Sequence, residues 1–224
     1  MARSRVILAA ILSCSLPQTS LSRASSSSLG AIVYADRAHL GAGNASAGTT
    51  IFPGDKLRTE PAGSLQIRAG AARLLLSASS SATLTLENDR PAAILTTGTA
   101  VFSTANSKAF TFHVAAAVIR PSTDLPTIAQ VMMLNPKEFL VKSVRASLRI
   151  AVEDDVREIP EGASYRIVLD PAAAEPGPQG PRGAGAKDHK WPIKKPKFIW
   201  IPISLAIIGT VWAVHEALES PDRP

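Results

Sequence analysis

The 224-residue chain is 46% hydrophobic but only 5% aromatic, which predicts a core built mainly from Val, Ile, Leu and Ala. Its single cysteine, Cys14, lies in an N-terminal targeting segment, so thiol catalysis, disulfides and cysteine metal ligands are excluded in the mature chain. The net charge of +6 arises mainly outside residues 25–170, which hold 14 bases and 13 acids. A nucleic-acid-binding function therefore loses its main support.

The N-terminus predicts a secretory signal peptide over residues 1–24. A short positive region ends at Arg5, the run from Val6 to Leu16 is apolar, and Ser22-Arg23-Ala24 offers the small residues that a signal peptidase recognises. The apolar run is too short to cross a bilayer as a helix. The alternative is a lipid anchor at Cys14, because Ile11-Leu12-Ser13-Cys14 loosely resembles a lipobox.

Residues 25–170 predict a single all-β domain. Phe52-Pro53-Gly54-Asp55 and Pro61-Ala62-Gly63 are predicted turns, and the residues between and after them alternate apolar and polar, as in half-buried antiparallel strands. Residues 39–49 predict a long loop, and residues 121–126 predict a break in the sheet. The architecture is predicted as a multi-stranded antiparallel sandwich, barrel or stacked sheet. Strands are predicted at 30–36, 55–60, 64–69, 72–77, 82–87, 92–95, 99–103, 109–114, 116–120, 127–133, 138–143, 147–152 and 164–169.

The order of several short motifs resembles the FecR-like domain family of bacterial envelope proteins, over roughly residues 28–169. The resemblance implies a regulatory or signal-relaying function in iron-responsive systems. The sequence departs from the family at Ala146-Ser147-Leu148, where a glycine usually opens a late hairpin. We also expect no room for the cytoplasmic sigma-factor-binding segment of better-studied relatives. The motifs are Gly30-Ala31-Ile32-Val33, Gly54-Asp55-Lys56-Leu57-Arg58-Thr59, the strand with Leu65 and Ile67, Leu95-x-x-Gly98-x-Ala100-x-Phe102, and Phe110-x-Phe112-x-Val114.

The C-terminal part predicts a tether. Residues 171–197 are rich in Pro, Gly and Lys and predict a spacer. Phe198 to Val214 is a run of 17 uncharged residues, from which we predict a transmembrane helix over 198–217 and a short tail over 218–224. The Lys187–Lys197 cluster would be cytoplasmic by the positive-inside rule, whereas a signal peptide exports everything before the helix. We favour the signal peptide, which places the β domain in the periplasm at the inner membrane.

No residue pattern indicates a catalytic, cofactor or metal site. The histidines His39, His113, His189 and His215 lack metal-ligand spacing, and His113 is expected to face outward from a strand. Glu153-Asp154-Asp155 is interpreted as a solvated turn in preference to a Ca²⁺ or acid–base site. Asn44-Ala45-Ser46 fits a glycosylation sequon that is common by chance, and no catalytic motif occurs.

These patterns predict a non-enzymatic, membrane-anchored envelope domain that binds a partner protein or a cell-wall polymer. The lipid bilayer, contacted by residues 198–217, is the other expected partner, and nucleic acid is not expected. The alternative from a different class is a hydrolase or binding protein for surface or cell-wall polysaccharide. Hydrolysis would need two carboxylates facing one cleft, about 5–10 Å apart.

Overall fold

The computed structural model describes residues 27–169 and 198–203. The predicted signal peptide, Cys14, the predicted spacer and residues 204–224 lie outside the described residues. The described part contains fifteen strands and no helix, which confirms the mainly β prediction. The strands are β1 (Gly30–Leu40), β2 (Gly43–Asn44), β3 (Thr50–Ile51), β4 (Lys56–Ala69), β5 (Ala72–Leu76), β6 (Ser81–Glu87), β7 (Arg90–Thr104), β8 (Thr111–Val114), β9 (Ala117–Pro121), β10 (Thr127–Asn135), β11 (Glu138–Arg145), β12 (Leu148–Val152), β13 (Asp155–Ile159), β14 (Ser164–Leu169) and β15 (Phe198–Pro202).

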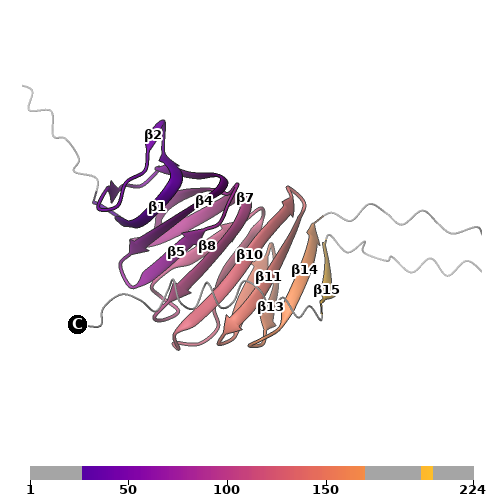
Figure 1. Cartoon of the computed structure of the whole chain (residues 1–224). Coiled ribbons are helices and arrows are strands. Elements are labelled where there is room, and N and C mark those ends of the chain that lie inside the picture. Colours follow the sequence, from indigo (N-terminus) through magenta and orange to yellow (C-terminus); the bar gives the residue numbers. More distant parts are fainter. Residues whose placement is uncertain (1–26, 170–197, 204–224) are drawn as a thin grey trace, which may run out of the picture.

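All fifteen strands belong to one sheet that folds back on itself into two layers (Figure 1). Its main path runs β13-β12-β9-β8-β7-β10-β11-β14-β15, and β1 to β6 extend from β7 and from β4. The core lies between the layers, where Phe102 of β7 stacks on Phe112 of β8 with ring centroids 5.0 Å apart. Of the three predicted architectures, this arrangement corresponds to the sandwich.

The long strand β7 joins the two layers because its halves have different neighbours. Its first half pairs with β6 and β8, and its second half pairs with β5 and β10. Pairing with β8 is parallel, with Ala92 opposite Thr111, whereas the other strand pairs of the described residues are antiparallel. The expected purely antiparallel sheet is therefore wrong at this one pair. A parallel pair needs a crossover connection, and here the second half of β7 carries the chain across to the other layer.

The Gly54–Thr59 motif has a clear structural basis. Gly54 lies in the predicted turn with a φ of 91°, and the Asp55 carboxylate accepts a hydrogen bond from the Phe52 amide at 2.8 Å. Leu57 is fully buried. The Thr59 hydroxyl is also buried and accepts a hydrogen bond from the Ser80 amide at 2.9 Å. The motif therefore starts β4 and holds the β5–β6 connection against it.

The predicted turn at Pro61-Ala62-Gly63 is wrong, because β4 runs through these residues. The pairing of β4 with β1 passes from Ala38 opposite Thr59 to Asp36 opposite Ser64, so four residues of β4 bulge against Arg37. Both Arg37 and Ala62 have positive φ, 44° and 65°. The turn-forming residues are thus used for a bulge within one strand, which increases local twist and lets pairing continue.

The structure also differs from the predictions in one loop and in one edge strand. The predicted loop over residues 39–49 contains the end of β1 and the short strand β2, whereas the predicted break after Pro121 is present. Strand β13 was not predicted because residues 155–158 are not buried and only Ile159 enters the core, so no alternation is visible.

The first five residues of the predicted transmembrane helix form β15, an edge strand that pairs with β14 in Figure 1. Residues 204–217 of that prediction lie outside the described residues. Across residues 27–169 and 198–203, nothing helical is long and apolar enough to cross a bilayer.

Candidate functional site

Three arginines lie in one row across the sheet. Successive register partners on β4, β5, β7, β10 and β11 are Arg68, Arg73, Ser103, Ile128 and Arg145. Directly opposed residues of neighbouring strands project from the same face. The row is on the outer face, because the residues that flank it along these strands include core side chains such as those of Leu74 and Phe102.

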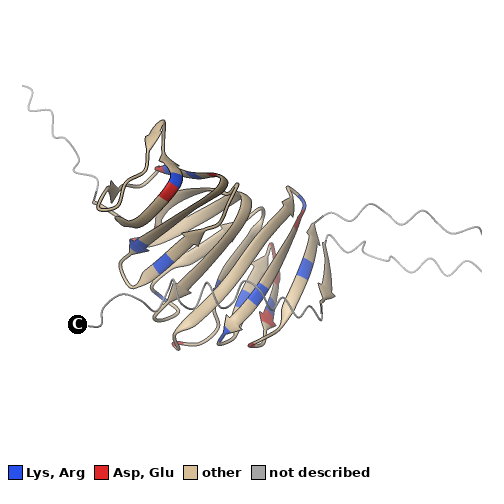
Figure 2. Ribbon diagram, in the orientation of Figure 1, with Lys and Arg blue, Asp and Glu red and all other residues tan. Residues whose placement is uncertain are grey.

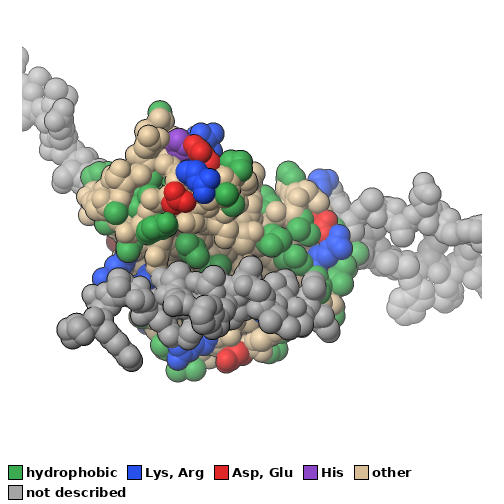
Figure 3. Space-filling view, in the orientation of Figure 1, with side chains coloured by type: hydrophobic (Ala, Val, Ile, Leu, Met, Phe, Trp, Pro, Cys, Tyr) green, Lys and Arg blue, Asp and Glu red, His purple; other side chains and the backbone are tan. Residues whose placement is uncertain are grey.

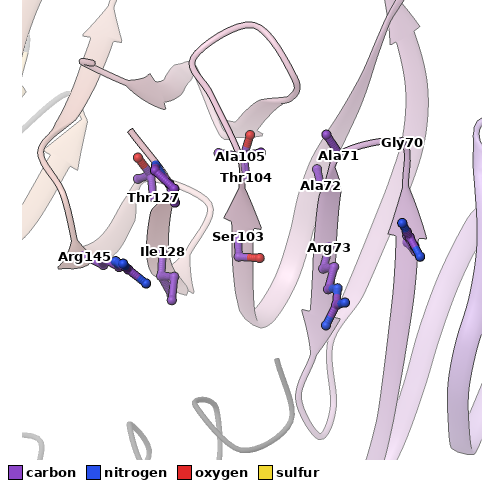
Figure 4. A pocket seen from close by; sticks show the side chains of 12 residues that line it. Gly70, Ala71, Ala72, Arg73, Ser103, Thr104, Ala105, Thr127, Ile128 and Arg145 are labelled. Atoms are coloured by element: carbon purple, nitrogen blue, oxygen red, sulfur yellow. The ribbon is translucent and has the colours of Figure 1, made fainter. Parts of the chain in front are cut away.

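The row lines a hollow of about 330 Å³. Gly70 and Ala71 of the β4–β5 turn, Ala105 after β7 and Pro126 before β10 form part of its wall. In Figure 4, Arg73 and Arg145 lie on either side of Ser103 and Ile128. We call this hollow, with Arg68, Arg73 and Arg145 as its charged residues, the arginine groove.

The described residues that line the arginine groove include no Asp or Glu, and Figure 2 shows a basic residue on β5. Guanidinium groups stay protonated at any physiological pH and bind carboxylate or phosphate through two parallel hydrogen bonds. Neighbouring strands lie about 4.8 Å apart, so Arg145, three strands from Arg73, is roughly 14 Å away from it. The spacing suits an extended anion with several negative groups better than a single small ion.

A second basic hollow, of about 310 Å³, lies over β9 and β12 and contains Arg90, Lys108, Arg120 and Arg149. Its charge is partly compensated. Arg120 lies 3.5 Å from Glu87, and Arg149 is the register partner of Glu158. Hydrogen bonds from Ser147 and Ser122, together with the charge of Arg149, lower the pKa of the Glu158 carboxyl. This hollow therefore has carboxylates next to two of its arginines.

The two histidines in the described part of the chain do not belong to a metal site. The His39 Nε2 atom lies 2.7 Å from Glu60 Oε1, and His113 Nε2 lies 2.9 Å from Glu87 Oε2. Each is a pair with one carboxylate, and no group of three or more potential ligands occurs among the described residues. The charged cluster near β1, which includes a histidine, is visible in Figure 3. His189 and His215 lie outside the described residues.

Of the acidic segment 153–155, which was predicted as a turn, Glu153 and Asp154 form a turn and Asp155 is the first residue of β13. Glu153 and Asp154 connect β12 to β13 as a two-residue hairpin, and Val152 pairs with Asp155. Asp155 has a further function that the sequence did not indicate, because its Oδ2 atom accepts hydrogen bonds from Arg157 Nε and Trp200 Nε1, each at 3.2 Å. Asn44, of the possible sequon, is exposed in β2.

The arginine groove was not predicted. Alternation along each strand predicts which residues point outward, but the three arginines come from three separate strands. Arg68 and Arg73 face each other across the β4–β5 pair, and Arg145 joins their row only through the pairing of β5 with β7, of β7 with β10 and of β10 with β11. Nearly balanced charge over residues 25–170 also concealed a local excess of positive charge.

Comparison with known proteins gives a distant structural likeness only. No family model and no curated protein matches the sequence. Two crystal structures of a "putative anti-sigma factor" from Parabacteroides distasonis ATCC 8503 are similar to this fold with a TM-score of 0.43, at 11% and 12% sequence identity. Each match covers 50% of this chain and 54% of the other, so this chain aligns with about half the length of those proteins. At this level the likeness carries no conclusion about function.

Proposed function

We propose that this protein is a non-enzymatic, FecR-like binding domain of a bacterial envelope with a regulatory or structural function. It is held at the inner membrane with the β domain in the periplasm. The observation that carries the proposal is that Arg68, Arg73 and Arg145, from three different strands, line one hollow. In this proposal the groove binds an extended acidic segment of an envelope protein or an anionic cell-wall polymer.

The location is supported by sequence. The signal-peptide pattern over residues 1–24 would export the domain, and the 17 uncharged residues from Phe198 would retain it at the membrane. A regulatory function is implied by the resemblance to the FecR-like family. The groove adds a site for a partner, since an open basic hollow on a sheet face needs no catalytic residue to bind an anion.

Site-specific photo-crosslinking tests this function. A photoreactive residue at Ser103 in the groove is expected to capture an envelope partner in living cells, and one at Thr85 on β6 serves as the control. Arg68→Gln with Arg73→Gln is expected to remove most of the Ser103 adduct, whereas Arg58→Gln, on the same strand as Arg68 but outside the groove, should leave it unchanged. Equal labelling at both positions, or an adduct that survives the double substitution, would contradict the proposal.

The polysaccharide-hydrolase alternative has less support. It requires two carboxylates that face one cleft, and the two hollows described above are lined by basic, small polar and apolar residues. Polysaccharide binding without hydrolysis remains within the proposal when the polymer is anionic. A crosslinked adduct that is sensitive to protease would identify a protein partner, and a protease-resistant adduct would identify a polymer.

A further inference from the structure

The edge of β14 holds an aromatic strand that is distant in sequence. β15 pairs with β14 over five positions, from Leu169 opposite Phe198 to Tyr165 opposite Pro202. The alternating residues Phe198 and Trp200 pack against the core, and Ile199 is 41% exposed. This arrangement is strand addition, in which backbone hydrogen bonds give affinity and pockets for alternate side chains give specificity.

Trp200 is recognised by both layers of the sandwich. Its ring meets Tyr165 of β14 edge-on with centroids 6.5 Å apart. From β13, the Arg157 guanidinium lies 5.1 Å from the ring centroid, and Asp155 accepts the indole N–H at 3.2 Å. Trp200 is half-buried, and its N–H has the hydrogen-bond partner that a tryptophan usually finds when it leaves water, so the pocket fits both the ring and the polar atom of this tryptophan.

The residues of β15 also begin the apolar run that predicts the membrane helix. They cannot pair with β14 and cross the membrane at the same time. The uncharged run from Phe198 to Val214 would reach about 26 Å as a helix at about 1.5 Å per residue, against a hydrocarbon core of about 30 Å. If residues 198–203 are held against β14, the 11 residues from 204 to 214 would reach only about 17 Å. Pairing of β15 and a full membrane crossing therefore exclude each other.

We propose that the β14 edge and the Trp200 pocket form a strand-binding site for residues 198–203, and that occupation of this site competes with membrane insertion. The competition rests on the membrane tether in the proposed function. The chain can make the exchange, because 28 residues separate Leu169 from Phe198 and could extend to roughly 90 Å. Insertion would leave the β14 edge unpaired, and an unpaired edge is a template for another strand.

A disulfide lock tests the competition in the full-length chain. Val168 and Ile199 are register partners outside the core, so Val168→Cys with Ile199→Cys should crosslink when β15 is paired. The reduced chain is expected to resist alkaline extraction from membranes, and the oxidised chain is expected to be released. The control, Lys142→Cys with Ser164→Cys, joins the partners β11 and β14 and should extract identically in both redox states.

The outcomes separate the two proposals. An oxidised chain that still resists extraction would overturn the competition. Release in both redox states would contradict the membrane tether of the proposed function, and with it the competition, whereas efficient crosslinking would still support the strand-binding site. Failure of Val168→Cys with Ile199→Cys to crosslink in any fraction would overturn the site itself.

A substitution outside the apolar run gives a second test. Asp155→Ala removes the acceptor of the Trp200 N–H. Added to the double-cysteine chain with Val168→Cys and Ile199→Cys, it should lower the crosslinked fraction by roughly three- to tenfold, as expected for a partly exposed hydrogen bond to a charged group. Asp154→Ala, at the neighbouring position in the turn and without this bond, should leave that fraction unchanged. Equal effects of the two substitutions would show that Trp200 is not specifically recognised.

Discussion

At the scale of single residues, Gly98 is fixed by close contact as well as by conformation. Its φ is 81°, and a Cβ at this position would lie 2.3 Å from the Ser80 hydroxyl and 2.6 Å from the Ser80 Cα. The buried Ser80 hydroxyl in turn accepts a hydrogen bond from the Thr99 amide at 2.8 Å. Gly98 therefore lies where β7 leaves β6 to pair with β5.

We expect Gly98→Ala to destabilise the domain by roughly 2–4 kcal/mol, because the methyl group adds backbone strain and displaces Ser80. Urea unfolding of the variant and the parent chain measures the difference. Gly70→Ala is the control, since Gly70 also has a positive φ but a Cβ there meets nothing within 4 Å, and its cost should be smaller. Equal losses in the two variants would contradict the close contact.

Replacing Ala146 by glycine should stabilise the folded domain. Its φ is 60°, in the left-handed region that favours glycine. The left-handed conformation costs a residue with a Cβ about 1–2 kcal/mol, whereas glycine adds about 0.4–1 kcal/mol of unfolded-state entropy. We expect Ala146→Gly to raise the unfolding free energy by about 0.5–1 kcal/mol. A lower midpoint in urea would show that the methyl group, which is mostly buried, contributes more by packing.

The sequence predicted where the backbone bends better than it predicted whether the bend is a turn or a bulge. The Gly54 turn was predicted correctly because Pro, Gly and Asp act within four residues. The same kind of residues at 61–63 form a bulge, since the decision depends on β1, which is more than twenty residues earlier. Local chemistry indicates where the backbone can bend, and only pairing determines whether the strand ends there.

At the scale of elements, β11 and β14 are joined by a charged pair on the surface. Arg166 Nε donates a hydrogen bond to Glu138 Oε1, and Asn135 donates to Glu138 Oε2 at 3.1 Å. The Arg166 hydrogen bond is the main cause that lowers the pKa of the Glu138 carboxyl below its ordinary value. The pair therefore contributes stability above the unfolded-state pKa, near about 4.3, and that contribution is lost as the pH falls through the lower folded-state value.

We expect Glu138→Gln to lower the thermal midpoint at pH 7, and we expect the difference from the parent chain to vanish once the pH is below the folded-state pKa of Glu138. Melting curves between about pH 7 and pH 2.5 measure this convergence. A constant gap between parent and Glu138→Gln at all pH values would show that packing, rather than charge, is lost.

Strands in which apolar and polar residues alternate were predicted from the sequence. The edge strand β15 was not. β12 buries every second residue and β6 and β11 do so over most of their length, so the sequence displays their period. β15 was predicted as part of a helix because an uninterrupted apolar run fits a membrane span, and its pairing with β14 depends on a strand nearly thirty residues earlier.

At the scale of the whole molecule, the position of charge matters more than its total. Residues 25–170 are nearly neutral, yet the described surface separates a groove with three arginines from a second basic hollow with adjacent carboxylates. The fold class was predictable because it depends on period. The site was not, since it depends on which strands become neighbours across the sheet.

Binding of a model polyanion distinguishes local from total charge. We expect the mature chain to bind poly-glutamate, and we expect Arg68→Gln, Arg73→Gln and Arg145→Gln together to weaken this binding at least about tenfold, because roughly 1.4 kcal/mol is a factor of ten and each charged hydrogen bond contributes about as much. Arg58→Gln, Arg90→Gln and Arg149→Gln together remove the same net charge outside the groove and should change the affinity less than about threefold. Rising ionic strength should lower the affinity for poly-glutamate most in the parent chain. The Debye length falls from about 10 Å at 0.1 M to about 3 Å at 1 M, which is well below the length of the arginine row. Equal weakening by the two triple variants would mean that total charge, and not the arginine groove, attracts the anion.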